Sequence, residues 1–112
     1  MRIWDIPVSK LCRQHLLGEH RELHAIWTYL TTPKGGSYRK HPETLRWFGR
    51  EADLFARHDE QAWEMERRGY RHASPLRVQG VRLRRSRAPL PLVNTIREQR
   101  LLLKAKRCEC KV

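Results

Sequence analysis

The chain has 112 residues, a net charge of +12, 39% hydrophobic residues and 32% charged residues. This length fits one domain with a modest core, so we expect a single domain over residues 1–112. No apolar run approaches the roughly 20 residues of a membrane span, residues 1–5 are too polar for a secretory signal, and the three cysteines do not suggest a disulfide framework. We therefore expect a protein of the reducing cytoplasm without a membrane partner.

The first third of the chain contains a clear helical pattern. A short segment over residues 1–8 leads to Ser9, a residue type that favours a helix N-cap. Over residues 10–31, apolar residues recur with helical spacing and fall on one face. They are Cys12, Leu16, Leu23, Ile26, Trp27 and Leu30. Residues 31–37 are rich in proline and glycine and are expected to form a loop.

Two further helices are expected. Pro42 suits the first turn of a second helix that runs to about Arg68, and Gly49 is the weak point in its interior. Its apolar stripe would be Leu45, Phe48, Ala52, Phe55, Ala56 and Trp63. Residues 70–91 are broken by prolines and read as irregular, and residues 92–106 read as a third helix. The fold class is therefore all-α: one compact domain of three helices, with the N-terminal segment packed against the first.

The basic charge is concentrated in the C-terminal part. Residues 1–66 hold ten basic and ten acidic residues, whereas residues 67–112 hold fourteen basic residues and two acids. The whole excess therefore lies in the second stretch. A one-sided basic surface indicates a polyanion partner, and nucleic acid is the first candidate. The alternative is a generic basic or ribosome-associated protein.

One polar face of the first helix is a candidate site. At helical spacing, His15, Gly18, Glu22 and Ala25 lie close together beside the apolar face. Glycine inside a helix costs about 1 kcal/mol relative to alanine, which indicates a reason for keeping the surface around Glu22 open. A ligand that approaches closely is one reason. Close packing against the N-terminal segment is the other.

The same stretch carries a family resemblance. Residues 14–23, Gln-His-Leu-Leu-Gly-Glu-His-Arg-Glu-Leu, follow an Arg2-Ile3 start. This pattern resembles the pyrimidine-dimer DNA glycosylases of the phage endonuclease V type, and residues 66–70 resemble the family's Lys-Arg-Gly-Phe segment. The resemblance is strong over residues 1–24 and around 64–70, and weak from residue 71 onward.

The resemblance implies an all-α enzyme that repairs DNA without a metal or organic cofactor. Members attack C1′ of the damaged nucleotide with an N-terminal α-amine, release the base, and nick the strand by β-elimination. The motif makes Glu22 the catalytic carboxylate and places Met1 where the family has its terminal amine. Because the bulky Arg2 would block removal of Met1, we expect Met1 to be retained. The implied partner is double-stranded damaged DNA, bound by a monomer associated with the nucleoid.

The resemblance and the charge pattern together suggest DNA-contacting residues. Arg21 matches a residue that grips backbone phosphate, and Arg100 and Lys104 match an Arg-x-x-x-Lys pair that lies along DNA. The full predicted set is Arg2, Gln14, His15, Gly18, Arg21, Arg82, Arg84, Arg85, Arg100 and Lys104. Trp4, Pro7 and Leu17 are candidates for a wedge that opens the duplex, and the sequence does not choose among them.

The chain departs from the family in two places. Ala25 stands where the family has a further arginine, and the C-terminal tail lacks the aromatic residues implicated in reading the dimer. These departures leave two alternatives open. The same amine and carboxylate could act on a different damaged or modified base, or the chain could be a DNA-binding protein without catalysis.

The remaining aromatic and metal-ligand signals are weaker. Trp27 and Trp63 are expected in the core, whereas Trp47 lies off the apolar stripe and is the candidate for an exposed aromatic near DNA. His20 and His24 have a metal-binding spacing but no evident third ligand. Cys108 and Cys110 lack a partner pair and read as free thiols. No metal site is therefore predicted.

Overall fold

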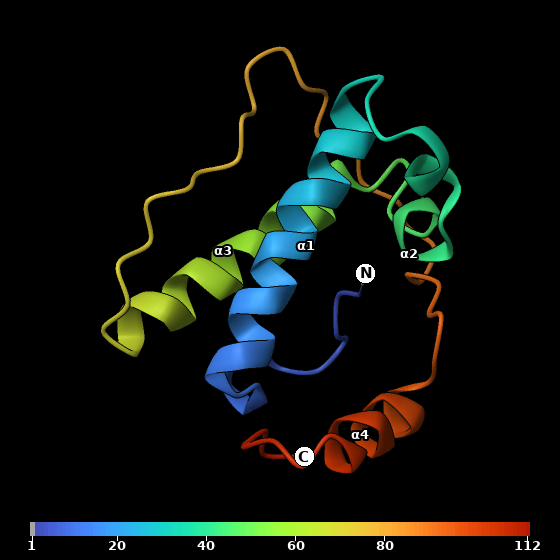
Figure 1. The fold of residues 1–112 in the computed structure, drawn as a ribbon. Helices are drawn as coiled ribbons and strands as arrows, with labels where there is room; N and C mark the ends of the chain where they lie inside the picture. Colours follow the sequence, from blue (N-terminus) through green and yellow to red (C-terminus); the bar gives the residue numbers. More distant parts are fainter. Residues whose placement is uncertain (1) are drawn as a thin grey trace.

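The computed structural model describes residues 2–112, which are all-α as predicted (Figure 1). Its helices are α1 (Arg13–Thr31), α2 (Pro42–Leu45), α3 (Glu51–Arg67) and α4 (Ile96–Ala105), with 3-10 turns at Val8–Lys10 (η1) and Gly36–Lys40 (η2). No strand occurs among the described residues. No helix in this part of the chain combines the length and apolarity needed to span a membrane.

Helix α1 starts three residues later than predicted. Ser9 lies inside the η1 turn, and the N-cap of α1 is Cys12. Leu11 is extended and only 2% exposed, so burial of its side chain separates the two elements. Three residues of the predicted stripe, Leu16, Leu23 and Ile26, are completely buried, and α1 ends at Thr31 as expected.

The predicted second helix is broken at Gly49. This glycine has a φ of +72°, which an α-helix cannot contain, and the break separates α2 from α3. As a result Trp47 turns into the core with 3% exposure, whereas Leu45 and Phe48 are exposed. The predictions of an exposed Trp47 and of a stripe containing Leu45 and Phe48 were therefore wrong.

Two other predictions for apolar residues were also wrong. Trp63 is 69% exposed on α3 rather than packed in the core. Helix α4 begins at Ile96 rather than residue 92, because Thr95 and Glu98 form a capping box that fixes its first turn. Leu92 and Val93 precede the helix and are exposed.

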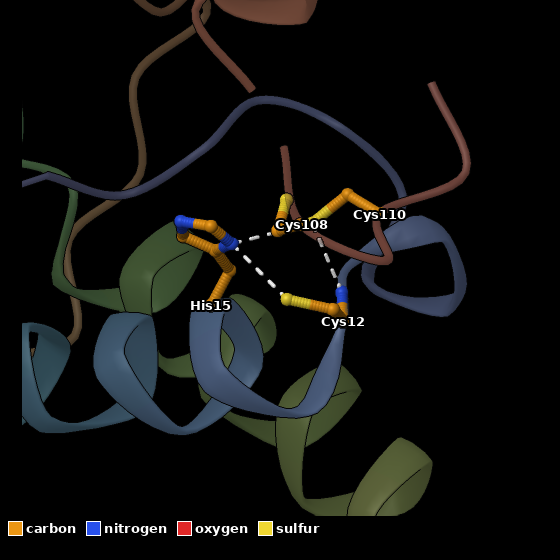
Figure 2. Close-up of side chains that lie close together, drawn as sticks. All are labelled: Cys12, His15, Cys108 and Cys110. Atoms are coloured by element: carbon orange, nitrogen blue, oxygen red, sulfur yellow. Dashed lines mark hydrogen bonds between the residues drawn. The ribbon is translucent and has the colours of Figure 1, made fainter. Parts of the chain in front are cut away.

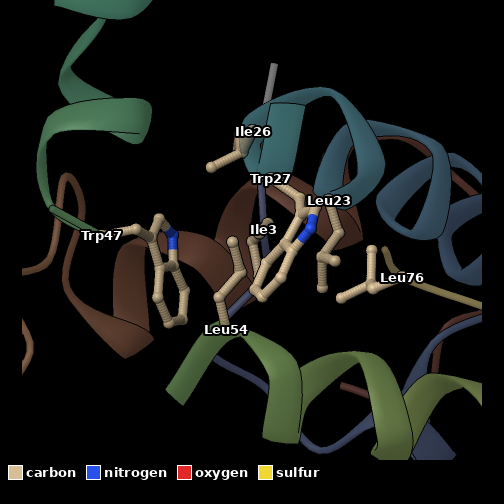
Figure 3. Close-up of a cluster of buried hydrophobic side chains, with 7 residues drawn as sticks. All are labelled: Ile3, Leu23, Ile26, Trp27, Trp47, Leu54 and Leu76. Carbon is tan, nitrogen blue, oxygen red and sulfur yellow. The ribbon is translucent and has the colours of Figure 1, made fainter. Parts of the chain in front are cut away.

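The N-terminal segment packs against α1, as predicted, and contributes to two hydrophobic clusters. Ile3 enters the cluster drawn in Figure 3, which is completed by Leu23, Ile26, Trp27, Trp47, Leu54 and Leu76. Trp4 and Ile6 join a second cluster with Leu11, Leu16, Met65 and Leu103. Since Leu103 is the buried apolar residue of α4, the second cluster is what packs α4 onto the domain.

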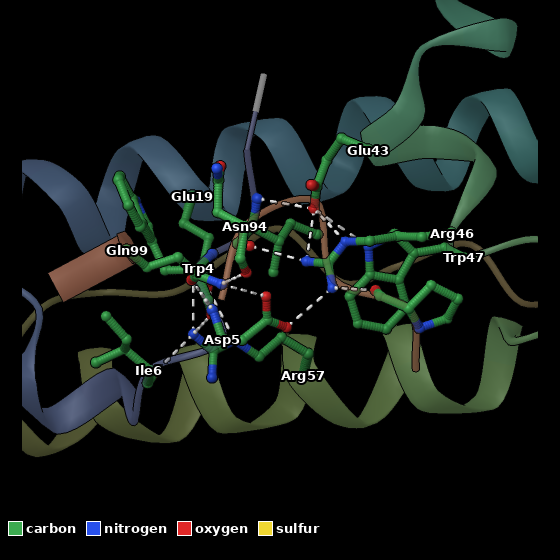
Figure 4. Close-up of polar contacts among 12 residues, drawn as sticks. Trp4, Asp5, Ile6, Glu19, Glu43, Arg46, Trp47, Arg57, Asn94 and Gln99 are labelled. Atoms are coloured by element: carbon green, nitrogen blue, oxygen red, sulfur yellow. Dashed lines mark hydrogen bonds and ion pairs between the residues drawn. The ribbon is translucent and has the colours of Figure 1, made fainter. Parts of the chain in front are cut away.

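Two arginines, Arg46 (buried) and Arg57 (half-buried), hold the backbone of the N-terminal segment (Figure 4). Arg46 donates to the carbonyl of Ile3 at 2.9 Å and pairs with Glu43 at 2.7 Å. Arg57 donates to the carbonyls of Trp4 and Ile6 at 2.6 and 2.9 Å. The segment has no strand partner, so these side chains satisfy main-chain groups that would otherwise be buried unpaired.

Four histidines gather where α1 meets α3. His20 and His24 from α1, His58 from α3 and His72 from the following loop have ring centroids 4.6 to 5.1 Å apart. His20 contacts the Gln61 amide, and His58 contacts the carbonyl of Ser74. Burial lowers the pKa of His58 to about 4, with a further contribution from the charges of His20 and His24.

The histidine cluster predicts loss of stability in mild acid. The unfolded chain takes up protons near pH 6.5, whereas folded His58 resists protonation down to about pH 4. The free energy of unfolding should therefore fall through this window, on the order of 2 kcal/mol for His58 after allowance for solvent screening. Urea denaturation at about pH 7 and about pH 5 measures the fall. A His58→Phe variant should show a smaller fall, and an equal fall in both proteins would contradict the explanation.

Candidate active site

A pocket of about 360 Å³ lies between the N-terminal segment and the first half of α1. It brings together six residues that the sequence singled out. They are Arg2, Gln14, His15, Gly18, Arg21 and Glu22. Trp4 and Glu19 complete the lining. The face predicted around Glu22 is therefore an open concave surface beside the start of the chain.

Gly18 keeps this pocket open. A Cβ atom built on Gly18 would meet no heavy atom within 4 Å, so the glycine is not required for close packing against the N-terminal segment. The sequence offered two explanations for this glycine, close packing against the N-terminal segment and close approach of a ligand. The structure favours the second. Gly18 and Glu22 line the same pocket, so a side chain at position 18 would take up part of that space.

The two carboxylates of the pocket have different surroundings. Glu19 is 2% exposed, and both of its oxygens are occupied by Arg57, at 3.0 Å each, together with the Trp4 amide and the Gln61 side chain. Glu22 is half-buried, and no hydrogen bond or ion pair reaches its carboxylate from residues 2–112. Glu19 is thus held in the scaffold, whereas Glu22 is available to a bound molecule.

Trp4 forms a wall of the pocket and connects two predicted site residues. The Arg2 guanidinium lies 4.8 Å from the centre of the Trp4 ring, and the His15 ring meets the same indole edge-on at 5.9 Å. Trp4 is only 6% exposed, which argues against the wedge role considered for it. Pro7 is exposed and Leu17 is half-buried, so both stay open as wedges.

One basic side chain from the C-terminal part, that of Lys106, lies near His15 of this pocket. Burial lowers the pKa of His15, and the neighbouring charge of Lys106 lowers it further, so the end of α4 is close to the pocket. Arg100 and Lys104 are exposed on α4. Sequence reasoning did not assign a role to Lys106, because its place beside α1 depends on how the tail folds back.

The arginine-rich loop lies elsewhere. Arg82 and Arg84 line a separate hollow of about 210 Å³ near the start of α3, where Arg84 forms an ion pair with Glu51 at 2.8 Å. Arg85 is exposed in the same loop, which runs along the outer side of α1 and α3 in Figure 1. The structure does not bring these three arginines to the Glu22 pocket, and their contact with DNA stays a prediction.

A larger hollow of about 710 Å³ lies between the N-terminal segment and α3. Its two buried or half-buried cations are already engaged: Arg57 holds Glu19 and the N-terminal backbone, and Arg50 donates to the Pro89 carbonyl at 3.1 Å. We therefore take the smaller pocket, whose Glu22 has no partner among residues 2–112, as the candidate active site. Met1, the predicted nucleophile, lies outside the described residues.

Sequence reasoning missed three features that only the folded chain brings together. Arg57 pairs with Glu19 across α1 and α3. His58 joins His20 and His24, so a third imidazole is present after all. Cys12 and His15 lie beside Cys108 and Cys110, so the expectation that these two cysteines lack partners was wrong. None of these contacts has a sequence spacing that could have revealed it.

The comparisons with known proteins agree with this geometry. A family model described as pyrimidine dimer DNA glycosylase matches residues 1–78, a span that contains every residue lining the Glu22 pocket. No curated protein and no solved structure matches the chain. Because the family model covers more than half of the sequence and includes the whole pocket, the chain belongs to the pyrimidine dimer DNA glycosylase family and is a DNA-repair glycosylase.

Proposed function

We propose that the chain excises damaged pyrimidines from double-stranded DNA and then nicks the abasic site, with the α-amine of Met1 as nucleophile and Glu22 as the catalytic carboxylate. One observation carries the proposal. Glu22 shares a pocket with Arg2, and its carboxylate is unpaired among the described residues while the neighbouring Glu19 is fully engaged. Met1 directly precedes Arg2 in the sequence, and consecutive Cα atoms are about 3.8 Å apart. This short covalent link is why we assign the nucleophile to the terminal amine.

The chemistry suits an α-amine. Its ordinary pKa of about 7.7–8.0 leaves a useful neutral fraction at physiological pH, whereas a lysine near 10.4 is almost wholly protonated. The amine nitrogen attacks C1′ as the bond from C1′ to the base breaks, and the sugar ring opens to give an imine. Loss of a C2′ proton then expels the 3′ phosphate. Glu22 would stabilise the developing positive charge and accept that proton.

The surroundings of the pocket suit a phosphate backbone. Gln14 and Arg21 are exposed at its edge, and the basic end of α4 lies beside it. Phosphate contacts of this kind orient a duplex without reading its sequence. A monomer with one such face can bind a duplex, while the lesion is recognised at the pocket itself. The base would have to leave the stack to expose C1′.

The two glutamates should behave differently when each is replaced by glutamine. Glu22→Gln keeps its shape and should bind abasic-site DNA normally, but nicking should fall by about 100-fold or more because the acid–base group is gone. Glu19→Gln removes a buried charge partner from Arg57 and should lower the melting temperature. Glu66→Gln, on an exposed position of α3, is the charge-matched control. Normal nicking by Glu22→Gln would contradict the assigned role.

The nucleophile can be tested by altering the N-terminus. Acetylation of the α-amine, or one added glycine before Met1, should abolish the adduct that borohydride traps with abasic-site DNA, because the nitrogen is blocked or displaced. DNA binding should persist in both proteins. An undiminished adduct would refute the amine mechanism, and the absence of an adduct with the unmodified protein would favour a binding protein without catalysis. Mass spectrometry should show Met1 at the terminus of active protein rather than Arg2.

A different lesion is the second candidate, and a specific observation supports it. Ala25 and the non-aromatic tail remove groups that the family resemblance associates with holding the dimer. A panel of duplexes with one lesion each separates the candidates. Fastest excision of a cyclobutane pyrimidine dimer is expected, and faster excision of another modified base would establish the alternative while leaving the amine and Glu22 in place.

A further inference from the structure

We infer that Cys12, His15, Cys108 and Cys110 form a structural zinc site that fastens the C-terminal tail to the start of α1 (Figure 2). Nothing in the family resemblance or in the proposed catalytic chemistry calls for a metal here. The inference depends instead on where the fold places these four side chains, and it is independent of the proposed function.

The donor set and its geometry fit tetrahedral zinc. The three thiol sulfurs and an imidazole nitrogen all lie within 4.8 Å of one another. The Nδ1 atom of His15 is 3.1 Å from the sulfur of Cys12 and 3.4 Å from that of Cys110. Zinc–sulfur bonds of about 2.3 Å and zinc–nitrogen bonds of about 2.0 Å require ligand atoms about 3.5–3.8 Å apart, so the donors need only small shifts to surround one ion.

The ligands come from two short pairs at opposite ends of the chain. Cys12 and His15 are one helical turn apart at the start of α1, and Cys108 and Cys110 flank Glu109 in the tail. Figure 2 shows the two pairs facing each other, with the His15 ring directed towards the sulfurs. Three cysteines and one histidine in this arrangement are a common structural zinc set.

The surroundings also suit bound thiolates. The amide of Cys12 donates to the sulfur of Cys110 at 3.0 Å, which is the outer hydrogen bond expected around a metal-bound sulfur. Cys12 is the N-cap of α1, where the helix dipole stabilises negative charge. The backbone amide of Lys111 donates to the carbonyl of Lys10 at 2.7 Å, which attaches the C-terminal tail to the end of η1.

The metal would give α4 and the tail a fixed place. Leu103 packs α4 into the core and the Gln99 side chain accepts from the Asp5 amide, whereas the tail beyond α4 contributes only the partly buried Cys110 and Val112 to the same cluster. A hollow of about 470 Å³ beside Cys12 and Cys108 shares Gln14 and Arg21 with the active-site pocket. Zinc would therefore anchor the basic C-terminal part beside Gln14 and Arg21, the exposed residues at the edge of the active-site pocket. His15 would then be a zinc ligand rather than a DNA contact.

The histidine cluster is the weaker candidate for a metal. His20, His24 and His58 also bring their nitrogens within 4.8 Å of one another. However, Gln61 engages Nδ1 of His20 and the Ser74 carbonyl engages Nε2 of His58, which leaves Nε2 of His20 and of His24 without a partner among the described residues, and this cluster contains no thiol. This cluster provides the control for the experiment.

The test is metal analysis of the full-length protein purified with reduced thiols. We expect one zinc per chain, and cobalt added to the metal-free protein should give the intense visible absorption of tetrahedral thiolate coordination. Cys108→Ser and Cys110→Ser should lose this absorption, whereas His24→Gln should keep it. Removing zinc with a chelator should lower the melting temperature of the wild type but not of Cys110→Ser.

Three outcomes would overturn the inference. One is a reduced wild-type protein that retains no zinc and gives no tetrahedral cobalt spectrum, a measurement that does not depend on whether any variant folds. Another is a native mass lower by two hydrogens, which would show a disulfide between two of the cysteines. The third is cobalt absorption that survives both cysteine substitutions but is lost in His24→Gln, which would move the metal to the histidine cluster.

Discussion

The grip of Arg46 and Arg57 on the N-terminal segment is the interaction on which the rest of the structure depends. An extended segment without a strand partner cannot be buried unless its amides and carbonyls find other partners. Glu43 and Arg46, at the end of α2, supply one set of partners, and Glu19 of α1 with Arg57 of α3 supplies the other. Both pairs are largely shielded from solvent, and removing one member of such a pair costs about 3–5 kcal/mol because the other charge is left uncompensated.

This arrangement connects stability to the chemistry of the pocket. Ile3 is buried against α1, and the Trp4 backbone amide donates a hydrogen bond to the Glu19 carboxylate. Arg2 therefore lies beside the next turn of α1, in the same pocket as Glu22. The same carboxylate, Glu19, thus holds both the arginine and the backbone that position the start of the chain. The two glutamates, one helical turn apart, differ in their contacts. Glu19 holds the N-terminal segment in place, and Glu22 has no partner among the described residues.

The sequence predicted the elements whose causes are local. Helix α1 was found because its apolar residues repeat with helical spacing, and the Glu22 face was found because the motif and Gly18 marked it. The sequence marked Gly49 only as a weak helix former, because a positive φ cannot be inferred from residue type alone, and the structure gives this glycine a φ of +72° beside the buried Trp47. On either side of this break, Trp47 is buried although it was expected on the surface, and Trp63 is exposed on α3 although it was expected in the core.

The remaining features required the tertiary structure. No spacing rule relates Cys12 to Cys108, or His24 to His58, because these contacts join elements far apart in the chain. The same holds for the basic residues. The sequence located the positive charge in the C-terminal part, but the fold separates it into an outer loop that carries Arg84 and a helix whose end approaches His15.

The most direct measurement maps the covalent bond between protein and DNA. After borohydride reduction of the complex with abasic-site DNA, the protein is digested and the modified peptide is identified by tandem mass spectrometry. We expect the sugar fragment on the α-nitrogen of Met1, in the peptide that contains Arg2. Attachment to Lys10, Lys104 or any other lysine side chain would contradict this expectation.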